Sequence, residues 1–309
     1  MAKIGNTQLD VSALNLGGNV FGWTADQQQS FAVLDAFVEA GGDFVDTADI
    51  YTAPVPGNSG GESETIIGNW MAARGNRQDI VVGTKVGQLT GGNSRKAIQA
   101  GIEGSLRRLR TDYIDLYYIH DDHPATPVSE TLTVLDELVR DGKVRYIAAS
   151  NFGPDRLTES LEFSDREGLA RYVALQPHYN LVHRDMYETD LRPVVEAYGL
   201  SVFPYFALAS GFLTGKHRPG SAADSARTGI VADYLTSPRA LSALAALDNI
   251  SAARGVQQST IAIAWLAAQP TVTAPIASAR TPEQLVALLD GVKLTLTDEE
   301  LAMLDKASA

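Results

Sequence analysis

The sequence predicts a TIM barrel, an α/β fold of the (β/α)8 type, on two observations. Eight short β-rich runs alternate with longer segments in which apolar residues recur every three or four positions. A doubly wound sheet would more often have five to seven strands and a glycine-rich first turn. The 309 residues suit one α/β barrel, so we expect a single domain over residues 1–309.

The expected strands and helices follow one another along the chain. The strands are residues 14–18, 43–47, 80–85, 113–120, 144–150, 172–177, 200–206 and 271–277. Four intervening segments have a clear helical period, namely residues 27–41, 94–109, 129–142 and 259–269. Ser94 and Ser129 suit helix N-caps, and Gly41 and Gly142 suit the left-handed position after a helix.

Two segments lie outside the strand and helix alternation. Gly5 and Asn6 form a turn pair between short β-capable pieces, which predicts an N-terminal β-hairpin before the first barrel strand, placed to plug the barrel's floor. Residues 216–238 are too long for a simple connection. They are interpreted either as a lid or binding loop, or as a surface insertion.

Composition restricts the classes of partner. The 37 acidic residues outnumber the 25 basic ones, and the formal net charge of −12 argues against binding to nucleic acid or to an anionic membrane surface. There is no cysteine, which excludes disulfides, thiolate metal sites and a cysteine nucleophile. No apolar run has the length of a signal peptide or a membrane span. We therefore expect a cytoplasmic protein that binds a small molecule.

Polar or ionisable residues stand at the end of every expected strand. In a TIM barrel the functional site forms at the carboxyl ends of the strands, where the loops converge. These residues are Gly18, Asn19, Asp46, Lys85, His120, Ser150, Asn151, Gln176, Tyr205, Ser278 and Arg280, and Tyr51 follows in the loop after Asp46. Each has another explanation, such as a carboxylate that caps a turn or a lysine that reaches solvent. Their joint occurrence predicts one shared site.

The four titratable groups predict proton transfer to an oxygen. A lysine ammonium beside a phenol is expected to lower the pKa of Tyr51, while Asp46 keeps Lys85 charged. His120 is expected to orient a substrate carbonyl or share the proton transfer. This chemistry fits carbonyl reduction, for which a cofactor must bring the hydride.

Two further motifs are interpreted as having no ligand. The run His120-Asp121-Asp122-His123 has metal-ligating residue types, but it lacks zinc-type helical spacing and a second cluster, so we expect no metal site. Residues 57–61, GNSGG, resemble a phosphate cradle in composition alone, and Glu62 and Glu64 would repel an anion. We expect a flexible loop before a helix with an acidic first turn.

Several segments together resemble the aldo-keto reductase family, of the bacterial NADP-dependent type. They are DFVDTADIY with GGESETIIG, VVGTK, YIDLYYIH, ETLTVLDELVRDGKVRYIAASNF, QPHYNLVHR, PYFALASGFLTGK and ASARTPEQL. The resemblance runs through nearly the whole chain. It implies a TIM barrel, a nicotinamide cofactor and a catalytic tetrad formed by Asp46, Tyr51, Lys85 and His120.

The same resemblance implies how NADPH is held. Ser150, Asn151 and Gln176 would bind the carboxamide, Tyr205 would stack on the nicotinamide ring, and the segment from Leu208 through Gly211 to Lys216 would follow the pyrophosphate. Ser278 and Arg280 would meet the 2′-phosphate, which favours NADPH over NADH, and Gln284 would touch adenine. Phe206 and Leu288 depart from the serine and asparagine common in the family.

Other functions stay open at this point. A lysine at a strand end could form a Schiff base, as in lyases and aldolases, with Lys85 as the amine. The family also includes accessory subunits of potassium channels. The substrate, the direction of the reaction and the strictness for NADPH are not indicated by the sequence. Phe21 and Trp23 are candidates for an apolar substrate wall, and we expect a monomer, as is usual in the family.

Overall fold

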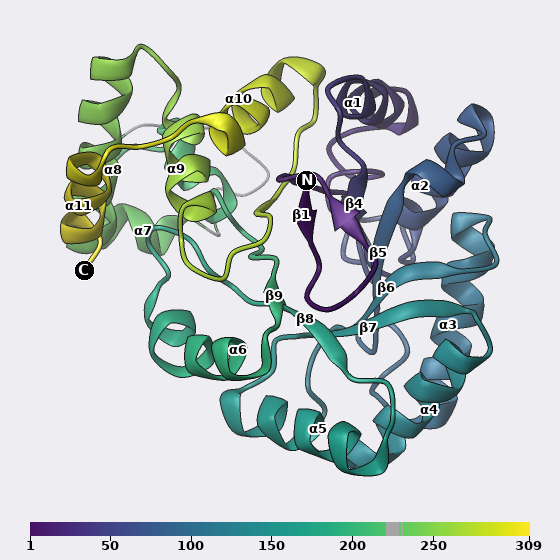
Figure 1. The fold of residues 1–309 in the computed structure, drawn as a ribbon. Coiled ribbons are helices and arrows are strands. Elements are labelled where there is room, and N and C mark those ends of the chain that lie inside the picture. The colour runs from purple at the N-terminus through teal and green to yellow at the C-terminus, as the bar shows by residue number, and fades with distance from the viewer. Residues whose placement is uncertain (221–228, 230) are drawn as a thin grey trace.

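The chain folds into the predicted TIM barrel (Figure 1). The computed structural model describes residues 1–220, 229 and 231–309. Its parallel sheet has the spatial order β10 (Ile276–Ala277), β3 (Asn15–Gly17), β4 (Phe44–Asp46), β5 (Val81–Val86), β6 (Ile114–Ile119), β7 (Val144–Ser150), β8 (Tyr172–Gln176) and β9 (Ser201–Val202). Backbone hydrogen bonds of 2.9 Å from Thr273 to Val202 and from Ile276 to Pro204 join the two edges.

All eight strands occur where the sequence predicts them, but β9 and β10 are shorter than expected. Pro204 and Pro275 lie inside the two predicted runs, and proline has no N–H to donate to a ladder. Thr271, at the start of the last run, has a φ of 73°, which is not a strand conformation. The ladder therefore breaks at both positions.

Helices surround the strands, as Figure 1 shows. They are α1 (Gln27–Glu39), α2 (Glu62–Arg74), α3 (Arg95–Leu109), α4 (Val128–Arg140), α5 (Pro154–Glu167), α6 (Arg192–Tyr198), α7 (Ala232–Thr236), α8 (Pro238–Arg254), α9 (Gln258–Ala267), α10 (Pro282–Lys293) and α11 (Asp298–Ala307). Short η helices are η1 (Arg77–Asp79), η2 (Met186–Leu191) and η3 (Ala209–Thr214).

The predicted helix ends are confirmed at three of four positions. Ser94 caps α3 by accepting a hydrogen bond from the Ala97 amide, and Gly41 and Gly142 have left-handed φ values of 87° and 73°. The prediction for Ser129 is wrong, because α4 begins at Val128 with Pro127 in the N-cap position. Proline lacks the N–H that a helix start leaves unpaired, so it suits this end of a helix.

The predicted N-terminal hairpin closes one end of the barrel. β1 (Ala2–Lys3) pairs antiparallel with β2 (Asp10–Val11), and Figure 1 shows β1 in front of the ring of strands. Ile4, Leu9 and Val11 are buried in a cluster with inward-facing strand residues, among them Phe44, Leu116, Tyr118, Ala148, Ala174 and Phe203. The interior is thus a packed core, and the open end is the one where the strands finish.

The long segment 216–238 falls partly outside the described residues. Residues 221–228 and 230 are not described, so the prediction of a lid or surface insertion stays a prediction. The short helix α7 lies at the carboxyl end of this segment. Among the described helices, none has the length and apolar character needed to cross a membrane.

The hairpin plug predicts a large stability effect at a position far from the strand ends. Ile4 is fully buried, so Ile4→Ala is expected to lower the free energy of unfolding by about 2–4 kcal/mol through lost burial and a residual cavity. Val286→Ala on α10 is the control, since Val286 is 55% exposed and its loss should change stability by less than about 0.5 kcal/mol. Urea unfolding of the purified proteins measures both values.

Candidate active site

Asp46 and Lys85 form a buried ion pair between neighbouring strands. Asp46 ends β4 and Lys85 lies near the end of β5, and both are almost completely buried. The Lys85 Nζ donates to Asp46 Oδ2 and to the Thr47 carbonyl at 2.7 Å each, and to Tyr51 Oη at 2.9 Å. All three ammonium protons therefore have partners.

The loop after β4 brings Tyr51 back to this pair. The Thr47 and Asp49 amides donate to the carbonyls of Gly83 and Lys85, so the backbone stays beside β5 beyond the end of the strand. The chain then turns, and the Tyr51 hydroxyl donates to Asp46 Oδ2 at 3.2 Å. The sequence spacing of Asp46 and Tyr51 was also compatible with a simple turn capped by the carboxylate. In the structure, the two side chains instead form a hydrogen-bonded network with Lys85.

The expected lowering of the pKa of Tyr51 is wrong. Burial, followed by the nearby Asp46 carboxylate, raises the pKa of the Tyr51 phenol well above its usual value. Burial also lowers the pKa of Lys85, although Asp46 acts in the opposite direction. Desolvation penalises both charged forms, and the sequence does not show the depth of burial. Tyr51 is consequently a neutral phenol at neutral pH and holds a proton to donate.

His120 faces Tyr51 across the site. The ring centroids of the two residues are 6.1 Å apart with an angle of 73° between the planes. Burial, with a smaller effect from Lys85, lowers the pKa of His120 to about 3, so the imidazole is neutral at neutral pH. Its Nδ1 is buried and lacks a hydrogen-bond partner among the described residues. A neutral imidazole has one N–H for a ligand oxygen.

Residues at the ends of β7 and β8 complete the wall. Gln176 donates to Asp46 Oδ1 at 2.8 Å, and Ser150 donates to the Gln176 carbonyl at 3.0 Å. Asn151, with a φ of 55°, donates to the His120 carbonyl and accepts a hydrogen bond from the Tyr205 hydroxyl at 2.8 Å. The predicted carboxamide-binding residues are thus linked to the tetrad in one hydrogen-bonded network.

These residues line a cavity of about 240 Å³, called here the catalytic cavity. Its wall contains three tetrad members and the four residues just described, together with neighbours from β3, β10 and the loops that follow β3, β5, β9 and β10. The lining is Gly17, Asn19, Asp46, Tyr51, Gln88, His120, Ser150, Asn151, Gln176, Tyr205, Phe206, Ile276 and Ser278. Lys85 lies behind this wall, where its ammonium contacts Asp46 and Tyr51.

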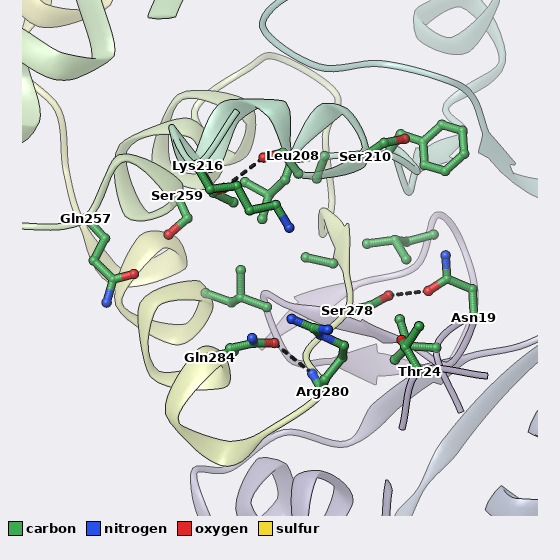
Figure 2. A pocket seen from close by; sticks show the side chains of 18 residues that line it. Asn19, Thr24, Leu208, Ser210, Lys216, Gln257, Ser259, Ser278, Arg280 and Gln284 are labelled. Carbon is green, nitrogen blue, oxygen red and sulfur yellow. Dashed lines mark hydrogen bonds between the residues drawn. The ribbon is translucent and has the colours of Figure 1, made fainter. Parts of the chain in front are cut away.

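A second cavity of about 320 Å³, called here the elongated cavity, adjoins the first (Figure 2). The two cavities share Asn19, Phe206, Ile276 and Ser278 as lining residues. Figure 2 shows Lys216 and Arg280 extending into the elongated cavity from opposite sides. The two adjoining cavities, together called here the cleft, place the tetrad and these two cations in neighbouring spaces, although the chain as a whole carries a net charge of −12.

The remaining predicted cofactor residues line the elongated cavity. Leu208 and Gly211 belong to a segment with left-handed backbone, and a side chain at Gly211 would meet Lys216. Ser278 donates to Asn19 Oδ1 at 2.6 Å, and Gln284 accepts a hydrogen bond from the Arg280 amide at 3.0 Å. Ser278 and Gln284 are thus already oriented by contacts within the chain.

Some lining residues were not predicted from the sequence as binding residues. Thr24, Gln257 and Ser259 line the elongated cavity, and Gln88 lines the catalytic cavity. These residues lie in loops or at the start of a helix, where no residue pattern marks them. Asn19, in contrast, stands directly after a strand, and its position was a usable signal.

The structure places Phe21 in the core. Phe21 is fully buried, packs in the outer hydrophobic cluster and lines neither cavity, which is the position of a structural residue rather than of a substrate wall. Trp23 is half-buried in the same loop and also lines neither cavity. The apolar ring that does face both cavities is Phe206, which is 38% exposed.

The GNSGG loop is held by the first residue of α2. The Glu62 carboxylate accepts hydrogen bonds from the Ser59 and Gly60 amides at 2.7 and 3.0 Å, and another from the Thr52 hydroxyl. The first turn of α2 is acidic, as predicted. Among the described residues, no group of three or more histidine or carboxylate side chains is arranged so that it could hold a metal ion.

Comparison with known proteins identifies the family. The model of the Aldo/keto reductase family matches residues 13–309. The chain belongs to the aldo/keto reductase family. The resemblance inferred from the sequence is thereby confirmed, and the aldo/keto reductases are oxidoreductases.

Individual relatives of this aldo/keto reductase support the assignment along the full chain. It is 34% identical to the uncharacterized oxidoreductase YrpG of Bacillus subtilis (strain 168), over 98% of this chain and 94% of the relative. It is 31% identical to an NADP(+) aryl-alcohol dehydrogenase of Phanerodontia chrysosporium, over 96% of this chain and 78% of the relative. It is 33% identical to a probable voltage-gated potassium channel subunit beta of Oryza sativa subsp. japonica, over 92% of this chain and 88% of the relative.

Behind the tetrad of this aldo/keto reductase lies a second buried carboxyl group, Asp49. It is 1% exposed, and neither carboxylate oxygen has a hydrogen-bond partner among the described residues. Burial, followed by the nearby Glu64 carboxylate, raises the pKa of Asp49 to about 7. Glu64 itself is paired with Arg108 at 2.6 Å. Asp49 therefore takes up a proton when the chain folds near neutral pH.

This burial predicts a pH-dependent stability. Because the pKa of Asp49 is raised on folding, its contribution to the free energy of unfolding falls as the pH rises from about 4 to about 7. At pH 8, Asp49→Asn is expected to have a free energy of unfolding ~2–4 kcal/mol higher than that of wild type, measured by urea unfolding. This gain is expected to vanish near pH 4. Exposed Asp112→Asn is the control. A gain that does not change with pH would contradict the assignment.

Proposed function

We propose that the protein reduces an aldehyde or ketone to the alcohol with NADPH as the cofactor. The observation that carries this proposal is the cleft that joins the tetrad to the two cations Lys216 and Arg280. A neutral phenol at one end and cationic side chains along the other suit a reaction that protonates an oxygen while an anionic cofactor is held nearby.

The lining of the cleft fits a phosphorylated dinucleotide. Two cations extend into the elongated cavity of a chain with net charge −12, so their placement favours an anionic ligand there. A guanidinium such as that of Arg280 binds a phosphate dianion through paired hydrogen bonds, which supports NADPH over NADH. An aryl-alcohol dehydrogenase among the relatives carries NADP(+) in its name. Gln284 and the Leu208–Lys216 segment would hold the adenosine and pyrophosphate portions.

The bound cofactor supplies the hydride, and the residues of this chain supply the proton and the orientation. The substrate oxygen would enter the catalytic cavity between Tyr51 and His120, which both line it. His120 donates a hydrogen bond from its neutral imidazole and orients the carbonyl group. Tyr51 gives its hydroxyl proton to the oxygen as negative charge develops there.

Lys85 stabilises the tyrosinate that remains, and Asp46 holds Lys85 in place. The Lys85 Nζ already lies 2.9 Å from Tyr51 Oη, so its positive charge is in place when the phenol loses its proton. Asp46 and the Thr47 carbonyl hold the ammonium in this position. Because each step is reversible, the same groups accept a proton when an alcohol is oxidised.

The buried position of Lys85 argues against the Schiff-base alternative. A lyase of this kind needs an unprotonated, accessible amine, whereas Lys85 is fully buried and donates three hydrogen bonds. The complete tetrad also favours catalysis over a purely accessory role.

We further propose a cytoplasmic monomer that acts on a small carbonyl compound or alcohol, without nucleic acid or membrane as a partner. A panel of sugars, small aldehydes and aryl ketones, with NADPH consumption as the readout, tests the reaction and narrows the substrate.

Removal of the Tyr51 hydroxyl tests the proton donor. Tyr51→Phe is expected to lower kcat by about 10²- to 10⁴-fold, because the phenyl ring cannot protonate the carbonyl oxygen. NADPH binding, followed by its fluorescence, should change by less than about threefold, or 0.7 kcal/mol. Tyr113→Phe, before the amino end of β6, is the matched control and should keep wild-type kcat. Retention of most activity in Tyr51→Phe would refute the assignment.

Removal of the Arg280 guanidinium tests the cofactor preference. Arg280→Ala is expected to raise KM for NADPH by about tenfold or more and to leave KM for NADH nearly unchanged, since NADH has no 2′-phosphate. Arg166→Ala, an exposed arginine on α5, controls for the general loss of a positive charge. Equal effects of Arg280→Ala on both cofactors would show that Arg280 does not distinguish them.

A further inference from the structure

Tyr205 belongs to a row of nearly parallel rings. The His178 ring stacks on Tyr205, with centroids 5.2 Å apart and 20° between the planes, and on His183 at 3.7 Å and 10°. Phe206 contacts both Tyr205 and His178 edge-on, at 5.0 and 5.3 Å. We call Tyr205, His178 and His183 the ring row. Of these three, Tyr205 alone lines the catalytic cavity.

The backbone fixes both histidines relative to Tyr205. The Tyr205 amide donates to the Pro177 carbonyl at 3.0 Å, and His178 and Tyr205 form a parallel bridge. Asn180 and His183 exchange two backbone hydrogen bonds of 3.2 and 3.1 Å, which close the loop that carries the histidines. The row therefore continues the β8–β9 pairing beyond the ends of the strands.

A buried asparagine ties this loop to the next one. Asn180 is fully buried, and its amide donates to the Phe206 carbonyl at 2.9 Å while its Oδ1 accepts from the Val182 amide. Phe206 has a φ of 54°, a conformation that few residues other than glycine adopt. Such a backbone persists where neighbouring contacts determine it, and Asn180 supplies one of these contacts.

The two imidazoles are uncharged at neutral pH. Burial, followed by His183, lowers the pKa of His178 to about 4, and burial also lowers the pKa of His183, with Asp185 and Arg239 acting on it in opposite directions. Neutral flat rings stack without the desolvation cost of a charge. The hydroxyl end of Tyr205 is held separately by Asn151.

We propose that His178, backed by His183, is a positioning residue that fixes the plane of Tyr205 so that its remaining surface receives the flat nicotinamide ring of the cofactor. His178 covers one side of Tyr205, and Tyr205 still lines the catalytic cavity, so a ligand ring meets the part that His178 leaves uncovered. The proposal rests on the proposed function. It assigns to the segment after β8 a role in cofactor binding that acts through Tyr205.

Binding of NADPH to three variants tests this role. His178→Ala removes the stacking partner and is expected to weaken NADPH binding about fivefold, whereas His178→Phe restores a flat ring and stays within about twofold of wild type. Exposed His123→Ala, which lies outside the ring row, controls for loss of an imidazole. NADPH fluorescence gives the dissociation constants, and thermal unfolding shows that each variant is folded.

A ligand without nicotinamide separates positioning from general damage. Adenosine 2′,5′-bisphosphate occupies the adenosine part of the site alone, so His178→Ala should bind it like wild type. Equal weakening for NADPH and the bisphosphate would overturn the proposal, as would unchanged NADPH binding in His178→Ala or an equal loss in His178→Phe. If wild type does not bind NADPH, the proposed function fails instead, and the two failures are therefore distinguishable.

Discussion

The buried pair of Asp46 and Lys85 is the interaction on which the site depends. Removing two opposite charges from water costs more than their attraction returns, unless other groups satisfy the remaining hydrogen-bonding positions. Here the Thr47 carbonyl, Tyr51 and the Gln176 amide do so. The pair consequently fixes β4, β5, β8 and the loop after β4 relative to one another. Loss of either charge would leave the other buried and uncompensated, and the position of Tyr51 would change with it.

Much of the fold and of the tetrad follows from the sequence, because both depend on patterns along the chain. Strand and helix periods gave the order of elements, and convergence of strand ends in a barrel gathered Asp46, Lys85 and His120. Depth of burial is not such a pattern. The pKa of Tyr51 was therefore predicted in the wrong direction, and Asp49 was not distinguished from an ordinary loop carboxylate. Phe21 lies in the same loop as Asn19, yet it is fully buried and lines neither cavity.

The elongated cavity was harder to derive from residue patterns. Its wall includes Phe206 and Ser210, which have left-handed backbone although neither is glycine. Sequence rules assign such conformations to glycine, asparagine or aspartate, so this turn carried no signal. Its geometry arises from contacts with distant residues, among them Asn180. Family resemblance located the segment, whereas its shape required the structure.

The N-terminal hairpin closes the core at one end of the barrel, and the ligand cleft lies at the other end. Because Ile4, Leu9 and Val11 fill the end beneath Phe44, closure of the core does not depend on the loops at the opposite end. Insertions and substitutions in those loops can therefore reshape the ligand cleft with little effect on the barrel's cohesion. Residues 2–11 thus close one end of the barrel, and the loops at the other end determine the shape of the cleft.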